Sequence, residues 1–374
     1  MINFDNSATS FPKPASVARA VSEAVSHFGG NPGRGGHKIS GEAAQKVFEV
    51  RSRAAEMFGA QVENVAFTLN CTYALNMAIK GIMQFGGHVI ISDYEHNAVS
   101  RPVYALWKMR GVRFSVARVS DDDDETVGNF RALIEKDTRA IVCTVASNVT
   151  GRILPYKKLG ELCKQHNICF IGDGAQACGV LGLTLADGFD FLCTAGHKAL
   201  YGPTGTGLLI SNGAFALSTI IEGGTGATSA ELEQTGTMPE RLESGTLGTV
   251  GIIGLGEGLK FVRRKTPEAI FAHEMRLCEQ FAQMIAQDKR VKIYEPQVRR
   301  VPVVAFNIGD MHSEKAAQML SQKGFALRGG LQCAALAHRT LGTLQQGVVR
   351  FSPSVFSEKA QVNALARAIY TMKE

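Results

Sequence analysis

Hydrophobic residues along this chain alternate between two periods from residue 41 to residue 211. Short apolar runs, typical of buried strands, are followed by segments in which apolar residues recur at helical spacing. The apolar runs predict strands at 65–68, 88–92, 112–119, 139–145, 168–172 and 207–211. The amphipathic segments predict helices at 41–58, 72–80, 98–110, 127–136 and 155–166. Strands that alternate with helices indicate an α/β fold, with a mainly parallel sheet covered on both faces.

The pattern changes after about residue 255. Helical periodicity over 255–264 and 267–287 leads to shorter strands at 303–307 and 348–352 and to a final helix from Ser357. A chain of 374 residues is also long for one compact hydrophobic core. We therefore expect a large α/β domain over 15–255 and a smaller α+β domain formed by 1–14 and 256–374.

Charge argues against two classes of partner. The net charge of +6, from 40 Lys and Arg against 34 Asp and Glu, is spread over the whole chain. No basic run concentrates it, so we expect neither nucleic-acid binding nor membrane binding. The one acidic run, Asp121 to Glu125, is interpreted as a solvated turn, and no metal site is expected.

The eight cysteines are scattered, without the C-x-x-C or paired histidine spacing of a zinc site. Several lie in apolar strand-like runs and are interpreted as buried, reduced thiols. The N-terminus shows no leader pattern, and no apolar stretch approaches the length that spans a membrane. A reducing cytoplasm is the expected compartment.

Ligands of parallel sheets collect beyond the carboxyl ends of the strands, so polar residues just after strands are the candidates for chemistry. Lys198 follows a strand and precedes a glycine-rich turn, and a buried lysine there is suited to a Schiff base with a carbonyl cofactor. Asp173, at another strand end, is suited to hold a pyridine nitrogen. Taken alone, Lys198 could equally be a surface residue and Asp173 a helix cap. Together, at the ends of two strands, they are a more specific signal for such a cofactor.

Seven stretches extend this pair along the chain. They are Asp5-Asn6-Ser7-Ala8-Thr9-Ser10, Asn31 to His37, Glu95-His96-Asn97-Ala98, Ser147 to Gly151, Asp173-Gly174-Ala175-Gln176, Gly196-His197-Lys198 and Glu243-Ser244-Gly245-Thr246. With them the whole chain resembles the class V aminotransferase-like enzymes of pyridoxal-phosphate fold type I, in particular cysteine desulfurases. The resemblance implies a large domain built on a mainly parallel, seven-stranded sheet.

The resemblance also implies pyridoxal phosphate as the cofactor, held covalently by Lys198, which then moves the substrate's α-proton. Asp173 would pair with the pyridine nitrogen, and His96 would stack on the ring as a candidate acid or base. The other implied cofactor contacts are Gln176 and Asn148 at the ring hydroxyl, Thr72, Cys71 and His197 around the phosphate, and Thr246 at the cofactor of a partner subunit. Ala195 replaces a Ser or Thr of many relatives, so Thr194 is a candidate to compensate at the phosphate.

The segment Arg328 to Ala334 matches the R-x-G-x-H-C-A loop of group II cysteine desulfurases. Cys333 falls on their nucleophilic cysteine, whereas Gln332 replaces their histidine and removes a proton partner for the thiol. Arg350 matches the arginine that binds the substrate carboxylate, a task that suits a planar guanidinium. Further substrate-binding candidates are Asn148, His37 and Arg328.

These matches imply a homodimeric cysteine desulfurase. It would convert L-cysteine to L-alanine and leave a persulfide on Cys333, which passes to an acceptor protein or small thiol. Other activities stay open: a selenocysteine lyase, a cystine C–S lyase or an aminotransferase on the same scaffold, because the fold does not name the reaction. A non-catalytic protein that binds the cofactor and acts as a scaffold for sulfur delivery is a further alternative.

Overall fold

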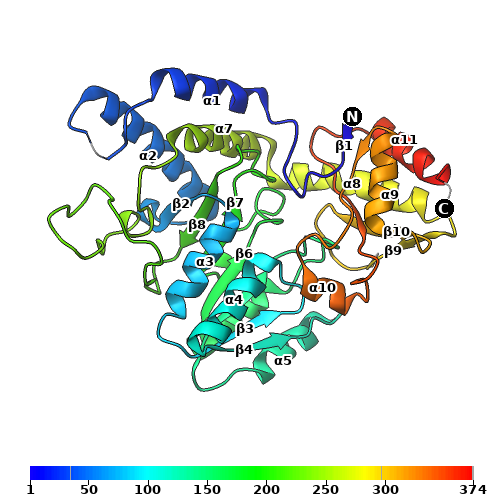
Figure 1. Cartoon of the computed structure of the whole chain (residues 1–374), viewed down its shortest axis with the longest axis horizontal. Helices are drawn as coiled ribbons and strands as arrows, with labels where there is room; N and C mark the ends of the chain where they lie inside the picture. The colour runs from blue at the N-terminus through cyan, green and yellow to red at the C-terminus, as the bar shows by residue number, and fades with distance from the viewer. Residues whose placement is uncertain (34, 296, 373–374) are drawn as a thin grey trace.

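A seven-stranded sheet forms the centre of the larger part of the molecule (Figure 1). The computed structural model describes residues 1–33, 35–295 and 297–372. The strands of this sheet are β2 (Val65–Thr68), β3 (His88–Ser92), β4 (Arg113–Ala117), β5 (Thr138–Thr144), β6 (Cys169–Asp173), β7 (Phe191–Ala195) and β8 (Gly207–Ser211).

The strand order is β2-β8-β7-β6-β5-β3-β4. The neighbours from β7 to β4 are parallel, whereas β8 runs antiparallel to both β7 and β2. The mainly parallel seven-stranded sheet expected from the sequence is therefore confirmed, with one reversed strand inside it.

Helices cover both faces of the sheet (Figure 1). Buried residues of α3 (Cys71–Ile82) and α4 (Asn97–Arg110) pack on one face, where strand residues such as Val89 and Ile171 meet them. The opposite face packs against α2 (Lys38–Phe58), α5 (Asp123–Ala132), α6 (Tyr156–His166) and α7 (Thr249–Lys265). α1 (Ala15–His27) packs on α7, and three short 3-10 helices lie at Val62–Asn64, Leu185–Asp187 and Glu240–Leu242.

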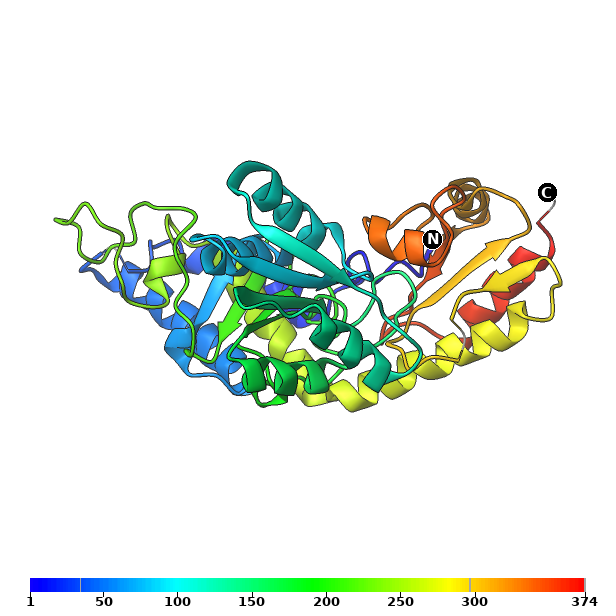
Figure 2. The ribbon, with the colours of Figure 1, turned by 90° about the horizontal axis from the view of Figure 1, so that it is seen from below.

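The smaller part has its own core around Phe4, Phe281, Phe306 and Phe351. Its three-stranded sheet has the order β12-β10-β9, and a two-stranded sheet pairs β1 with β11. Its elements are β1 (Ile2–Asn3), α8 (Pro267–Ile285), β9 (Val291–Ile293), β10 (Val304–Ile308), α9 (Ser313–Gln322), β11 (Phe325–Ala326), α10 (Ala335–Thr340), β12 (Val349–Phe351) and α11 (Lys359–Tyr370). α8 runs from the larger part into this one (Figure 2), and both ends of the chain lie here (Figure 1).

Two expectations need adjustment. The boundary expected at residue 255 lies inside α7, which continues to Lys265 while packed on α1 and α2, so the division into domains stays a prediction. The acidic run is also more than a turn. Asp122 caps α5 by accepting the amide hydrogens of Asp124 and Glu125, so the helix begins at Asp123 and ends at Ala132, earlier than expected.

Helix α1 was not predicted from the sequence. Its buried face consists of Val17, Ala20 and Ala24, which recur at helical spacing, so the sequence did carry a signal for this helix. Within the described residues, no helix combines the length and the apolar character needed to cross a membrane.

Candidate active site

Four polar residues follow four neighbouring strands of the large sheet. His96 follows β3, Asn148 follows β5, Asp173 ends β6 and Lys198 follows β7. Because these strands are parallel neighbours, their carboxyl ends meet at one edge of the sheet. A cavity of about 300 Å³ lies there, and all four side chains line it.

The cavity also brings together residues that are far apart in the sequence. The other sequence-predicted residues that line it are Cys71, Thr72, Gln176, His197, Arg328, Cys333 and Arg350. The last three belong to the C-terminal part of the chain, so the site lies between the large sheet and the smaller part. Three predicted residues, Thr194, His37 and Thr246, are not among its lining residues.

Asp173 is the buried acid of the site, with 3% of its surface exposed. Its Oδ1 accepts the backbone hydrogen of Ala175 at 2.9 Å and the thiol of Cys71 at 3.4 Å. Burial raises the pKa of the Cys71 thiol, and the nearby Asp173 charge adds to this. Cys71 is therefore a neutral donor that helps to hold the carboxylate in place.

Lys198 lies close to this acid at the end of β7. Burial lowers the pKa of its amine, with smaller contributions from Arg350 and Arg328, while Asp173 and Cys71 act in the opposite direction. A lower pKa increases the fraction of neutral amine, which is the nucleophilic form. Ser10 of the N-terminal segment fixes the backbone here, since its hydroxyl donates to the Lys198 carbonyl at 2.8 Å.

His96 caps the N-terminus of α4. Its Nδ1 accepts the amide hydrogen of Ala98 at 3.0 Å, so in the neutral ring the hydrogen is assigned to Nε2. Burial lowers its pKa to about 4, with nearby cations contributing and Asp173 opposing. His96 is therefore neutral at pH 7 and presents an uncharged aromatic ring to the cavity.

The N-terminus of α3 provides a place for an anion. Asn70 caps this helix by accepting the amide hydrogen of Tyr73, and the next residues, Cys71 and Thr72, line the cavity. Backbone N–H groups in the first turn of a helix favour negative charge. His197 lies at the same cavity, and burial, together with Lys198 and Lys13, lowers its pKa to about 4.

Thr194, the candidate to compensate for Ala195, is not among the residues that line the cavity. Successive side chains of a strand point to opposite faces of the sheet, and Ala195 is the residue that faces the cavity. Thr194 is fully buried on the other side, where its hydroxyl lies 3.5 Å from the carbonyl of Gly174.

Arg350 also lines the cavity and is almost fully buried. One guanidinium nitrogen donates to the Asn148 carbonyl at 2.8 Å and another to the Asp5 carboxylate at 2.7 Å. Burial lowers its pKa, and the Asp5 charge opposes the shift. Two contacts therefore fix the plane of this guanidinium before any ligand binds.

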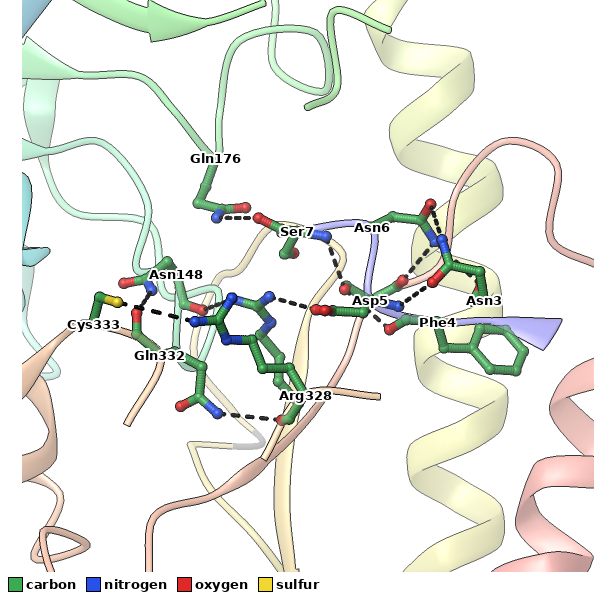
Figure 3. A network of polar contacts seen from close by, with 12 residues as sticks. Asn3, Phe4, Asp5, Asn6, Ser7, Asn148, Gln176, Arg328, Gln332 and Cys333 are labelled. Atoms are coloured by element: carbon green, nitrogen blue, oxygen red, sulfur yellow. Dashed lines mark hydrogen bonds and ion pairs between the residues drawn. The ribbon is translucent and has the colours of Figure 1, made fainter. Parts of the chain in front are cut away.

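Cys333 lies on the loop between β11 and α10, and its side chain is exposed (Figure 3). Its carbonyl accepts the amide hydrogen of Asn97, the first residue of α4, at 2.7 Å. A guanidinium nitrogen of Arg328 lies 4.0 Å from its sulfur. The thiol is thus anchored at the cavity next to His96 while still open to solvent.

The residues of the cavity fit pyridoxal phosphate. Among the residues that line the cavity, three buried polar atoms have no hydrogen-bond partner within the described residues, namely His197 Nδ1, Asn148 Oδ1 and Arg350 Nε. Buried polar groups are normally paired, so a polar ligand is needed to complete this site. The cofactor's phosphate, pyridine nitrogen and aldehyde match the α3 N-terminus, Asp173 and Lys198.

Thr246 and His37 lie away from this cavity. Thr246 accepts a hydrogen bond from the side chain of Asn31 at 3.3 Å, and His37 caps α2 by accepting the amide hydrogen of Ser40. Neither residue can therefore contact a cofactor or substrate in its own chain's cavity as these residues are arranged, and their predicted roles stay predictions. Arg34, which belongs to the same matching stretch, lies outside the described residues.

Comparisons with known proteins agree with this geometry. A family model described as aminotransferase class-V matches residues 2–365. The chain belongs to the class V aminotransferase family. Enzymes of this family use pyridoxal phosphate.

The relatives within this family are cysteine desulfurases. The chain is 31% identical to a cysteine desulfurase from Dickeya dadantii, over 98% of this chain and 90% of the relative. It is 26% identical to a probable cysteine desulfurase from Methanothermobacter thermautotrophicus, over 97% and 93% of the two chains. The apo structure of a cysteine desulfurase from Thermococcus onnurineus NA1 superposes with a TM-score of 0.92 at 28% identity, covering 98% and 93%. The resemblance inferred from the sequence is therefore confirmed.

Sequence reasoning missed two residues beside the site, Lys13 and Asp5. Lys13 donates to the His197 carbonyl at 2.6 Å and to the Ser10 hydroxyl at 2.8 Å, and burial lowers its pKa to about 8. Asp5 pairs with Arg350. Asp5 lies in a stretch that matches the family, which was the available signal; Lys13 follows that stretch and had none.

Proposed function

We propose that this chain is a pyridoxal-phosphate-dependent cysteine desulfurase that converts L-cysteine to L-alanine and collects the sulfur as a persulfide on Cys333. The observation that carries the proposal is the position of Cys333. Its thiol is exposed on a loop that borders the same cavity as Lys198 and Asp173. The cysteine desulfurase names of the relatives support the same reaction.

Pyridoxal phosphate bound in the cavity would supply an aldehyde for the substrate amine and an electron sink for the charge left at the α-carbon. Lys198 would hold the cofactor and, once released, remove the α-proton with its neutral Nζ. Asp173, kept in place by Ala175 and Cys71, would keep a proton on the pyridine nitrogen. His96 would cover the ring as a neutral imidazole.

Arg350 would bind the substrate carboxylate, which would also pair its free Nε. This orientation directs the substrate's sulfur toward the loop of Cys333. The Cys333 thiolate would then attack that sulfur, forming a sulfur–sulfur bond as the substrate's carbon–sulfur bond breaks. The electron pair of the broken bond stays with the carbon side, which takes up a proton to become alanine.

Product analysis with L-cysteine tests the proposal. Wild-type chain loaded with pyridoxal phosphate should release alanine and carry ³⁵S on Cys333 after incubation with labelled cysteine. Cys333→Ala should still bind cofactor and substrate but lose sulfur release by several powers of ten, because no other group replaces a positioned thiolate. Leu331→Ala is the matched control, since Leu331 is an exposed neighbour on the same loop.

The products also separate the alternatives. Pyruvate and ammonia, with Cys333→Ala as active as the wild type, would replace the proposal with a C–S lyase. Amino-group transfer to a keto acid would indicate an aminotransferase, and faster turnover of selenocysteine than of cysteine would indicate a selenocysteine lyase. Cofactor binding with no product would indicate the scaffold.

We further propose a homodimer in which Thr246 contacts the phosphate in the partner's cavity. Thr246 borders a separate hollow of about 180 Å³ that includes Leu69 and Tyr73, and it is not among the lining residues of its own chain's cavity. A second hollow of about 340 Å³ beside it is lined by Phe48, among other residues, and Phe48 is 55% exposed. Such apolar surface is suited to contact with a second copy.

An acceptor protein or small thiol is proposed to remove the sulfur, because the exposed Cys333 can be approached from outside. A reducing cytoplasm is the proposed compartment. All eight cysteines are free, and an exposed nucleophilic thiol works only while it stays reduced.

A further inference from the structure

Gln332 stands where related loops have a histidine, yet its side chain points away from the neighbouring Cys333 (Figure 3). Only 4% of the residue is exposed. Its amide nitrogen donates to the carbonyls of Arg328 at 3.2 Å and Val348 at 2.9 Å. Its amide therefore joins the start of the Cys333 loop to the strand segment that carries Arg350.

The amide oxygen of Gln332 is paired as well. It accepts from Nε2 of His338, a fully buried residue of α10, at 3.1 Å. Since this oxygen can only accept, Nε2 of His338 must carry the hydrogen. Nδ1 is then the acceptor in the neutral ring, and the hydroxyl of Thr343, 2.7 Å away, donates to it. In this series of hydrogen bonds, Thr343 therefore donates to His338, and His338 donates to Gln332.

The backbone of Gln332 has a further partner. Its carbonyl accepts from the side-chain nitrogen of Asn148 at 2.6 Å. Through its side chain and its carbonyl, one buried residue is therefore hydrogen-bonded to Asn148, to Arg328 and to the strand two residues before Arg350. Asn148, Arg328 and Arg350 are the candidate substrate-binding residues that these contacts connect.

The loop needs such support because of its backbone conformation. Gln332 and Cys333 have φ angles of 42° and 58°, the left-handed region that residues with a Cβ seldom adopt. Two such residues in succession persist only when surrounding contacts hold them. The hydrogen bonds of Gln332 lie at the first of these two residues, and the bond from Asn97 to the Cys333 carbonyl lies at the second.

We propose that Gln332 and His338 act together as positioning residues that hold Cys333 in its left-handed conformation and so direct its sulfur toward the substrate. Gln332 lines the cavity, but its side-chain amide is bonded to Arg328, Val348 and His338. For its effect on turnover the proposal rests on the proposed function; for its effect on the loop it does not. The pair does not replace the histidine of related loops as a proton partner of the thiol; its effect is on the position of the loop.

The test compares His338→Leu, which removes both hydrogen bonds, with His338→Gln, which can donate to Gln332 and accept from Thr343. Hydrogen–deuterium exchange of the Asn97 and Ala334 amides reports on the loop without any substrate. Both amides bond to loop carbonyls, those of Cys333 and Leu331. We expect faster exchange of these two amides in His338→Leu, near wild-type exchange in His338→Gln, and unchanged exchange in the central strands.

Turnover gives the second readout. His338→Leu should lower kcat for L-cysteine by on the order of 100-fold, as a misplaced reactive group does, while KM and cofactor affinity change little. His338→Gln should recover most of kcat. Gln332→Leu combined with His338→Leu should be no worse than either alone, because the two act as a unit. Thr343→Val, which removes only the support behind the imidazole, provides a milder variant if His338→Leu does not fold.

Two results would overturn the proposal. The first is unchanged exchange at Asn97 and Ala334 in a folded His338→Leu or Thr343→Val variant. The second is a His338→Gln that loses as much kcat as His338→Leu, because the pair would then not act through its hydrogen bonds. Failure of the wild type to desulfurate cysteine would refute the proposed function instead, and the exchange measurement would still decide whether the pair holds the loop.

Discussion

Burial acts in the same direction on the basic side chains around the cavity. It lowers the pKa of Lys198 and brings those of His96 and His197 to about 4, because a charged form loses its hydration inside the protein. Burial also raises the pKa of the Cys71 thiol, so that Asp173 has a neutral donor beside it. The site therefore keeps its imidazoles uncharged at pH 7 and favours the neutral form of its amine near the buried carboxylate.

A chemical trap tests Lys198 against its neighbour Lys13. Borohydride reduction of the holoenzyme should fix the cofactor on Lys198, because its amine lines the cavity whereas that of Lys13 is bonded to Ser10 and the His197 carbonyl. Peptide mapping by mass spectrometry gives the site. Lys198→Ala should carry no covalent label and lose more than about 1000-fold in kcat. A label on Lys13 in the wild type would contradict the assignment.

Arg350 gives a prediction about substrate binding. Arg350→Lys keeps a positive charge but cannot contact Asp5, the Asn148 carbonyl and a substrate carboxylate at once. We expect KM for L-cysteine to rise about 10- to 100-fold, with cofactor affinity unchanged. Steady-state kinetics and cofactor titration measure the two effects. A KM equal to that of the wild type would show that the carboxylate binds elsewhere.

At the scale of elements, α8 carries a buried acid as it passes from the larger part into the smaller one. Glu274 of α8 accepts a hydrogen bond from the Tyr201 hydroxyl at 3.2 Å, and burial raises its pKa to about 8. Tyr201 lies three residues after Lys198, and its hydroxyl also accepts the amide hydrogen of Val355. This contact links the helix to the segment that follows β7.

The pKa of Glu274 predicts a pH dependence of stability. The folded chain keeps this carboxyl protonated up to about pH 8, whereas the unfolded chain ionises it near about pH 4.3. The folded state thus binds the extra proton, and its stability falls as the pH rises between these values. Glu274→Gln should remove this contribution. The melting temperature of the variant minus that of the wild type should therefore increase from pH 5 to pH 8.

The control is Glu279→Gln, at an exposed position of the same helix. It should follow the wild-type curve throughout. If the melting temperatures of Glu274→Gln and the wild type changed in parallel with pH, Glu274 would be ionised in the folded chain.

At the scale of the whole molecule, the segment that carries Thr246 is tied to the large sheet by a buried ion pair. Both carboxylate oxygens of Glu243 accept from Arg51 of α2, at 2.7 and 2.9 Å, and one of them also accepts the amide hydrogen of Phe67 in β2. Glu243 thereby fixes the segment that carries Thr246, a residue that does not line the cavity of its own chain. Such an arrangement suits a contact with a second copy.

Mixing two variants, each impaired as a homodimer, tests this composite site. Thr246→Val should weaken cofactor binding, and Lys198→Ala should abolish activity. In a mixed dimer, the cavity of the Thr246→Val chain keeps its Lys198 and receives Thr246 from its partner, so activity should reappear after subunit exchange. Activity assays with sedimentation of the mixture measure this. No recovery despite a demonstrated mixed dimer would show that Thr246 does not serve the partner's cavity.

The sequence by itself determined the layers of the fold and indicated candidate site residues, most of which line one cavity. Alternating apolar runs and helical periodicity predicted the parallel sheet, since a buried strand and an amphipathic helix are properties of consecutive residues. Strand ends and matching stretches are also local features of consecutive residues, and they indicated Lys198, Asp173 and Cys333. Helix α1 was missed although its buried Val17, Ala20 and Ala24 recur at helical spacing.

Only the tertiary structure decided where side chains point and what they meet. Thr194 and Ala195 are neighbours in sequence, but the register of β7 sends one away from the cavity and the other into it. Asp5 meets Arg350 across 345 positions of sequence, and Gln332 turns toward His338 and away from Cys333. Such contacts depend on how separate elements pack, a long-range property that local patterns of residues do not encode.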